Sequence, residues 1–289
     1  MNEIKNISIE DKNYPKLLKK IADPPKVLYY LGEIKPKENC FAIVGTRRFS
    51  AYGKQVALEI AGDLAEAGLT IVSGFAPGID TFAHTACIER KKRTIAVLGT
   101  GLDEKSIFPR SNLKLVNKIL ETGGCLISEY PPRTHGTKLT FPQRNRIISG
   151  LSLGVLVVEA KQKSGALITA SFAFSQKRKV FAVPGSIYSS NSKGCHYLIK
   201  KGAKLVENAN DIFKELSFKG LRRDLRPEIE GETKEENLIL ETLKAEALYV
   251  DEIIKRTKIS PATVASTLAI LEIKGKVRNL GGNVYAISR

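Results

Sequence analysis

Loops that carry glycine or arginine follow several short apolar segments of this sequence. The first is Gly45-Thr46-Arg47-Arg48, which ends the apolar segment 41–45 and precedes a helical pattern over 52–68. Glycine lets backbone N–H groups approach an anion, a helix N-terminus adds partial positive charge, and a guanidinium can donate two parallel hydrogen bonds to a phosphate. These residues predict a phosphate-sized anion site, with a tight turn that carries two surface arginines as the alternative.

Three further loops have the same character. Each follows an apolar segment, and together they supply the candidate binding residues Ser73, Gly74, Arg110, Ser164, Gly165 and Thr169. Four such loops at one edge of a sheet favour a groove for an extended anion over a pocket for one small molecule. The first loop matches neither G-x-G-x-x-G nor G-x-x-x-x-G-K, so the usual signals of nicotinamide cofactors and of ATP hydrolysis are missing.

The segment 141–150 combines an aromatic ring with polar and cationic side chains. Its candidate residues are Phe141, Arg144, Asn145 and Arg146. An aromatic ring can stack on a base, while guanidinium and amide groups contact phosphates and base edges, so the segment is typical of a nucleic-acid contact. The alternative is an amphipathic helix in which the apolar pair 147–148 packs on the sheet and the arginines are solvated.

Groups for catalysis or metal binding are scarce. The chain has three histidines and no H-E-x-x-H motif. Its four cysteines lie far apart without a C-x-x-C pair, which indicates reduced thiols and argues against a disulfide framework. We therefore expect no catalytic residue, no metal and no cofactor, and hence no enzyme.

Six short apolar segments, mostly β-branched, are the elements that would position these loops. They cover residues 41–45, 70–74, 94–99, 125–130, 154–160 and 179–185, and helical patterns lie between them. Segments that are apolar on both faces are typical of buried parallel strands. The alternation predicts an α/β fold: an extended Rossmann-like, doubly wound and mostly parallel sheet, closed by residues 203–208 and a helix near 209–216.

The pattern changes along the chain and predicts four regions. Residues 1–38 form a short N-terminal extension, 39–216 the Rossmann-like domain, 217–233 a linker of mixed charge, and 234–289 a small domain. In the last region two helical patterns precede a third that starts at the N-cap Ser260 with Pro261 at its first position, and a Gly-Gly turn joins two strands at the end. This order indicates a winged helix.

The distribution of charge indicates the class of partner. The chain has 46 Lys and Arg against 30 Asp and Glu, a net charge of +16. Residues 39–216 hold 25 of the basic and 13 of the acidic side chains, so most of the excess falls on the Rossmann-like domain and favours a polyanion. Because the chain has no long apolar run and a charged N-terminus, we expect a cytoplasmic protein without a membrane contact.

The third helix of the small domain differs from a DNA-reading helix. Residues 260–273 contain no Lys or Arg, whereas Lys274, Lys276 and Arg278 follow it. A helix that reads the major groove normally carries polar or basic side chains for the base edges. We therefore predict that the winged helix mainly contacts protein or offers a wing to the DNA backbone.

Several ordered motifs resemble a known family. GTRRFSAYG, VSGFAPGIDTFAH, GTGLDEKSIFPRSN, ISEYPP, FPQRNRIISGLS, VVEAKQKSGALITA, VPGS and KGCHYLIKKGA are similar to segments of the DNA processing protein A family, also called DprA or Smf. The resemblance spans about residues 10–215. The tail from about residue 234 resembles the winged-helix domain that many members carry.

The resemblance implies a function and a set of contacts. It implies a non-enzymatic Rossmann-like protein that binds single-stranded DNA, forms a homodimer and loads the RecA recombinase onto incoming strands in natural transformation. By motif, the DNA contacts fall on Arg47, Arg110, Phe141, Arg144, Asn145 and Arg146, and the pocket also draws on Ser73, Gly74, Ser164, Gly165 and Thr169.

Two other classes of function stay open. Related Rossmann-like sheets host nucleotide-hydrolysing phosphoribohydrolases, whose signature is a P-G-G-x-G-T loop near a catalytic glutamate; here that loop reads K-S-G-A-L, and Glu159 is the only carboxylate close to it in sequence. A winged-helix transcription regulator with a ligand-sensing α/β domain is the second, and the absence of basic residues in the third helix disfavours it.

Overall fold

The computed structural model describes residues 3–216, 230–244 and 246–287. The chain divides into two compact units, Met1–Arg223 and Asp224–Arg289. Most of the predicted linker, 217–229, lies outside the described residues. Among the described helices, none is both long and apolar enough to cross a lipid bilayer.

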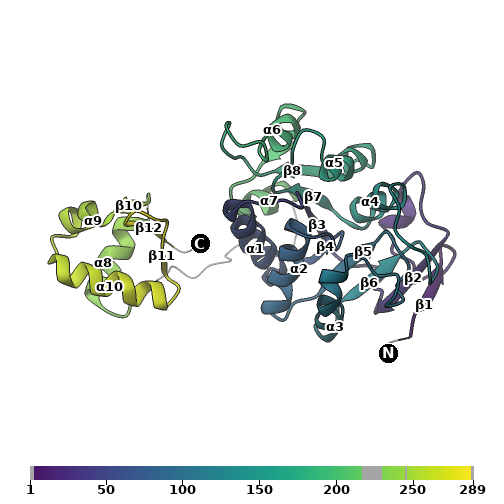
Figure 1. Cartoon of the computed structure of the whole chain (residues 1–289), viewed down its shortest axis with the longest axis horizontal. Coiled ribbons are helices and arrows are strands. Elements are labelled where there is room, and N and C mark those ends of the chain that lie inside the picture. Colours follow the sequence, from purple (N-terminus) through teal and green to yellow (C-terminus); the bar gives the residue numbers. More distant parts are fainter. Residues whose placement is uncertain (1–2, 217–229, 245, 288–289) are drawn as a thin grey trace. The chain divides into compact units, whose positions relative to one another are not determined.

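A nine-stranded sheet forms the centre of the N-terminal unit, in the order β1-β2-β6-β5-β4-β3-β7-β8-β9 (Figure 1). The six predicted strands are present and pair in parallel: β3 Cys40–Val44, β4 Thr70–Ser73, β5 Thr94–Leu98, β6 Cys125–Ser128, β7 Gly154–Val157 and β8 Lys179–Ala182. All their residues are buried apart from the first residue of β8, as expected for strands that are covered on both faces. The short β9, Lys204–Leu205, adds a parallel edge strand. The predicted α/β fold is confirmed.

Helices cover both faces of this sheet. On one face α1, Ala51–Glu66, packs against α2, Ile79–Glu89, which contacts α3, Leu113–Glu121. On the other face α4, Thr140–Leu151, packs against α5, Gly165–Ser175 (Figure 1). The chain continues through α6, Lys193–Lys200, and α7, Ala209–Leu216. Short 3-10 helices lie at Leu18–Lys20 and Arg110–Asn112.

The N-terminal segment extends the same sheet. Strands β1, Lys5–Ser8, and β2, Val27–Gly32, form an antiparallel pair, and β2 pairs antiparallel with β6. Between them the buried Tyr14 donates its hydroxyl to the carbonyl oxygen of Pro25 at 2.7 Å. Sequence patterns had indicated only an extension here, because a single apolar run is visible. The structure shows that the segment packs on the main core.

The C-terminal unit has the predicted winged-helix order. Helices α8 Lys234–Leu243, α9 Val250–Thr257 and α10 Pro261–Ile273 pack with a sheet of order β10-β12-β11, formed by Leu248–Tyr249, Val284–Ile287 and Val277–Asn279. Ser260 caps α10 by accepting a hydrogen bond from the Thr263 N–H at 3.2 Å. The unit has an apolar core of its own, formed by Ile239, Leu240, Leu243, Leu248, Ile253, Val264, Leu268, Leu271 and Val277.

Candidate functional site

A groove runs along the carboxyl edge of the parallel strands. Because β3 lies between β4 and β7, the loops that follow these strands meet at one edge, where α/β sheets bind ligands. The groove has a volume of about 810 Å³. The structure brings the following predicted site residues together in its lining: Gly45, Thr46, Arg47, Phe141, Arg144, Asn145, Ser164, Gly165 and Thr169.

The loop that carries Arg47 is held in place by Glu159 at the end of β7. The Thr46 N–H donates to the Glu159 carbonyl oxygen at 2.8 Å. The buried Glu159 carboxylate accepts the Ser50 hydroxyl at 2.6 Å and the Ser50 N–H at 3.0 Å. Gly53 permits this approach, since a Cβ there would lie 2.2 Å from a carboxylate oxygen. Glu159, the carboxylate that a hydrolase would require, is thus occupied in fixing the start of α1.

Two buried residues of opposite charge, Asp80 and Arg144, support the floor of the groove. Asp80 accepts the Gly74 N–H at 3.1 Å, and Arg144 donates to the carbonyl oxygens of Gly74, at 2.5 Å, and of Val97. Burial raises the pKa of Asp80, and the nearby Arg144 opposes this shift. Burial also lowers the pKa of Arg144 to about 10. The Arg144 guanidinium, on a side chain that is only 5% exposed, therefore ties the loop after β4 to β5.

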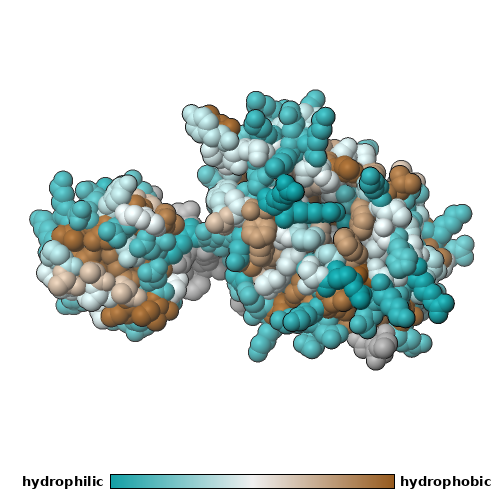
Figure 2. All heavy atoms as spheres, viewed as in Figure 1, coloured by the Kyte–Doolittle hydropathy of each residue, from teal (hydrophilic) through white to brown (hydrophobic). Residues whose placement is uncertain are grey.

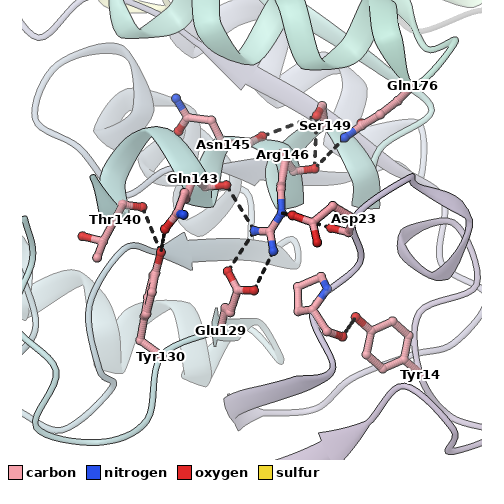
Figure 3. Close-up of polar contacts among 11 residues, drawn as sticks. Tyr14, Asp23, Glu129, Tyr130, Thr140, Gln143, Asn145, Arg146, Ser149 and Gln176 are labelled. Atoms are coloured by element: carbon pink, nitrogen blue, oxygen red, sulfur yellow. Dashed lines mark hydrogen bonds and ion pairs between the residues drawn. The ribbon is translucent and has the colours of Figure 1, made fainter. Parts of the chain in front are cut away.

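Arg146 makes a second set of internal contacts (Figure 3). Its guanidinium donates to both carboxylate oxygens of Glu129, at 2.5 and 2.8 Å, and to Asp23 Oδ2 at 2.9 Å. The hydrogen bond to Glu129 is the main cause that raises the pKa of Arg146 against the opposing effect of burial. The residue is 8% exposed, and the neighbouring pair 147–148 is buried in the core. These contacts join α4 to β6 and to the N-terminal segment.

Exposed cations and aromatic rings surround the opening of the groove. Arg47, Lys138, Lys161 and Lys163 are exposed and line it. The Phe108 and Phe141 rings lie 5.8 Å apart, and the Arg47 guanidinium carbon lies 6.0 Å from the Phe141 ring centroid. Within the described part of the chain, no carboxylate forms an ion pair with these four cations. The three lysines were missed by sequence reasoning, although two of them follow β7 directly in the K-Q-K-S-G loop.

The remaining predicted residues lie beside or beneath this groove. Ser73 is buried and donates its hydroxyl to the Ile43 carbonyl oxygen at 2.6 Å, which supports β4 from within. Arg48 is exposed on the same loop as Arg47. Arg110 borders an adjoining hollow of about 310 Å³, which shares Phe108 and Phe141 with the groove. Gly74 and Arg146 have the internal contacts described above.

Comparison with known proteins identifies the family. The model of the DNA recombination-mediator protein A family matches residues 5–217, and that of the DprA winged-helix domain matches residues 223–283. The chain belongs to the DprA/Smf family. DprA of Bacillus subtilis is 48% identical over 215 residues, which is 74% of this chain and 71% of that protein. The chain spans about half of the Smf proteins of Synechocystis and Escherichia coli, at 52% and 56% of their lengths.

Solved DprA structures have the same fold. DprA of Streptococcus pneumoniae is 43% identical with a TM-score of 0.70, over 75% of this chain and 76% of that one. DprA of Helicobacter pylori, whose structure was described for its single-stranded DNA binding mode, is 32% identical with a TM-score of 0.65, over 75% of this chain and 98% of that one. Membership of the DprA/Smf family places this chain among the DNA-processing recombination mediators.

Proposed function

We propose that this DprA/Smf member binds single-stranded DNA in the groove and acts as a non-enzymatic recombination mediator. In this proposal it protects incoming single strands and loads the RecA recombinase onto them during natural transformation. One observation carries the proposal: exposed cations without carboxylate partners among the described residues surround an aromatic pair in one groove. This combination suits a polyanion whose bases are free to stack.

The residues of the groove divide into two roles in this proposal. Arg47, Lys138, Lys161 and Lys163 contact phosphates, since each is exposed at the opening. The rings of Phe108 and Phe141 stack on bases. Smaller polar groups hold the backbone of the strand, namely Gly45, Thr46, Asn145, Ser164, Gly165 and Thr169.

The other predicted contact residues have flanking or supporting roles. Arg48 and Arg110 extend the cationic surface on either side of the groove. Ser73, Gly74, Arg144 and Arg146 act through their internal hydrogen bonds, which fix the loop after β4 and the helix α4. We keep Arg144 and Arg146 in the DNA site as positioning residues, because both occur on the helix that presents Phe141.

The remaining parts of the proposal rest on the family. They are a homodimer, a direct contact with RecA, a cytoplasmic location and the absence of catalysis, cofactor and metal. The contacts of Glu159 with Ser50 support the absence of catalysis, because both oxygens of that carboxylate accept hydrogen bonds from Ser50.

Fluorescence anisotropy of labelled oligothymidine, compared with duplex of the same length over a salt series, tests the proposal. For about four phosphate contacts, log K should fall with log salt with a slope near −3, at about 0.7 per contact for single strands. The triple variant Arg47→Ala/Lys161→Ala/Lys163→Ala should weaken binding by more than about tenfold and flatten this slope.

The matched control is Lys91→Ala/Lys92→Ala/Lys118→Ala, which also removes three positive charges. The three lysines are exposed and lie near the ends of α2 and α3, where the chain enters β5 and β6 at the opposite edge of the sheet. This control should bind like wild type. Equal or tighter binding of duplex, or an unchanged triple variant, would contradict the proposal. Release of free base from a nucleoside monophosphate would instead favour the phosphoribohydrolase class.

A further inference from the structure

The loop between β8 and α6 presents an aromatic side chain to solvent. It spans residues 183–192 and lies beside α6 in the N-terminal unit (Figure 1). Tyr188 is 92% exposed and its neighbour Ile187 is 72% exposed. The turn is ordered by its own hydrogen bonds: the Ser189 N–H donates to the Ser186 carbonyl oxygen at 3.1 Å, and the Tyr188 N–H to Ser186 Oγ at 3.3 Å. The turn therefore holds an aromatic ring in solvent, where a ligand can reach it.

This loop is joined directly to the loop that carries Arg47 and Arg48. Asn191 Nδ2 donates to the Arg48 carbonyl oxygen at 2.9 Å, and the Tyr52 hydroxyl donates to the Pro184 carbonyl oxygen at 2.8 Å. Tyr52 is itself about half exposed. The order β3-β7-β8 makes the loop after β8 the next one along the edge, and adjacent strands lie about 5 Å apart. The loop therefore continues the edge that forms the groove.

The charge around this loop matches that of the groove. Residues 184–204 contain no Asp or Glu, and they carry the exposed lysines Lys193, Lys200 and Lys201, while Lys204 is paired with Glu215 at 3.2 Å. Arg48, to which the loop is joined, is exposed as well. A polyanion that leaves the groove on this side meets these cations and two tyrosine rings. A strand with unpaired bases can use both features, whereas a duplex cannot stack its internal bases on a tyrosine.

We propose that Tyr188, together with Tyr52, forms a second stacking subsite that receives the bases of a single strand after it passes Arg48. This inference rests on the proposed function, and it extends the DNA track beyond the groove. A strand long enough to reach the loop gains the stacking contact, and a short strand that fills only the groove does not. Affinity should therefore rise with strand length beyond the size of the groove, and Tyr188 should carry much of that rise.

A single fluorophore tests the position of the strand. The chain contains no tryptophan, so Tyr188→Trp introduces the only one. Oligothymidines of increasing length are titrated while anisotropy of a label on the DNA reports binding. We expect long strands to quench the tryptophan, and the shortest strands that bind to leave it unchanged. Lys118→Trp, exposed near the end of α3, is the control and should not respond.

Affinity measurements on Tyr188→Ala and Tyr188→Phe complete the test. The Ala variant should lose about tenfold in affinity for long strands and nothing for short ones, while the Phe variant retains wild-type affinity for both. If long strands saturate the protein by anisotropy without quenching, or if the Ala variant weakens short and long strands equally, the subsite is overturned and the groove proposal stands. Quenching by RecA but not by DNA would overturn it in favour of a protein contact. If no strand binds, both proposals fail.

Discussion

The groove and the winged helix use their cations in opposite ways. At the groove, Arg47, Lys138, Lys161 and Lys163 are exposed, and no ion pair of the described residues involves them. In the C-terminal unit, Lys274 lies 2.7 Å from Glu236 and 2.9 Å from Glu232, and Lys276 lies 3.6 Å from Glu232. The number of basic residues therefore says less about a DNA site than whether each one already has an acidic partner.

The groove opening is cationic, whereas the surface of the winged helix over α10 is apolar. Helix α10 carries no Lys or Arg and exposes Ile270 and Ile273, the latter at 87%. Figure 2 shows hydrophobic patches over α10 in the C-terminal unit. A surface of this kind suits a protein partner better than a phosphate backbone, which agrees with the sequence-based prediction for this unit. We expect DNA affinity to reside in the groove.

Charge reversal should separate the two regions most strongly. The variant Arg47→Glu/Lys163→Glu replaces two attractive contacts with two repulsive ones, and should weaken single-strand binding by about a hundredfold or more at moderate salt. Lys274→Glu/Lys276→Glu makes the same change in net charge in the C-terminal unit. It should alter binding by less than about threefold. Anisotropy titrations at one fixed salt concentration measure both.

Two controls make this comparison interpretable. Circular dichroism and thermal unfolding of each variant show whether the fold is retained. This check is needed most for the Lys274→Glu/Lys276→Glu variant, because it removes the ion pairs of Lys274, whereas Arg47 has no acidic partner among the described residues. A loss of binding in the Lys274→Glu/Lys276→Glu variant that matches the groove variant, with its fold intact, would show that the winged helix is part of the DNA site.

Acid should destabilise the two units at different pH values. Burial lowers the pKa of His84 from 6.5 to about 3, and its Nε2 has no partner within the described structure. Below pH 6.5 the unfolded chain therefore binds a proton that the folded unit excludes, and stability falls as the pH drops from about 6.5 toward 3. By about pH 5 the N-terminal unit should have lost about 2 kcal/mol.

The C-terminal unit contains no histidine, and hydrogen bonding to Lys274 lowers the pKa of Glu236. Its stability should hold until the pH falls to about the ordinary glutamate pKa of 4.5, and should then decline as the pH drops toward the lowered pKa of Glu236. Thermal unfolding at stepped pH measures both transitions. His84→Asn keeps an amide group that can hydrogen-bond to Thr94 Oγ1, which lies 2.8 Å from the ring Nδ1, and should remove the dependence between pH 6.5 and 5. A dependence that survives in this variant would assign the effect to another group.

The sequence predicts the fold more completely than the site. Six buried strands are readable because β-branched residues recur in short runs between helical patterns, and Ser260-Pro261 marks the start of α10. The positions of the loops at the carboxyl edge can also be predicted from the sequence, because each loop follows a predicted strand. Local pattern is sufficient wherever the neighbouring residues in sequence decide the structure.

Local pattern does not reveal the partners of a charged side chain. Arg144 and Arg146 contact groups contributed by the N-terminal segment, β5 and the loops after β4 and β6, which are 17 to 123 residues away in sequence. Lys161 and Lys163 look like any other surface lysines until the fold places them at the groove opening. The distinction between a positioning arginine and a DNA-contacting lysine therefore requires the tertiary structure.

Removal of the winged helix should have the smallest effect on DNA binding. A chain that ends at residue 216 keeps the whole groove and the loop after β8, so its affinity for oligothymidine should remain within about threefold of the full chain. The fragment 230–289 has its own apolar core and should fold alone. Because α10 lacks basic side chains and Lys274 is paired, the fragment should bind duplex weakly and without sequence preference. Tight, sequence-specific binding of duplex by the fragment at physiological salt would reverse the contrast between the two regions, and would place base reading in the C-terminal unit.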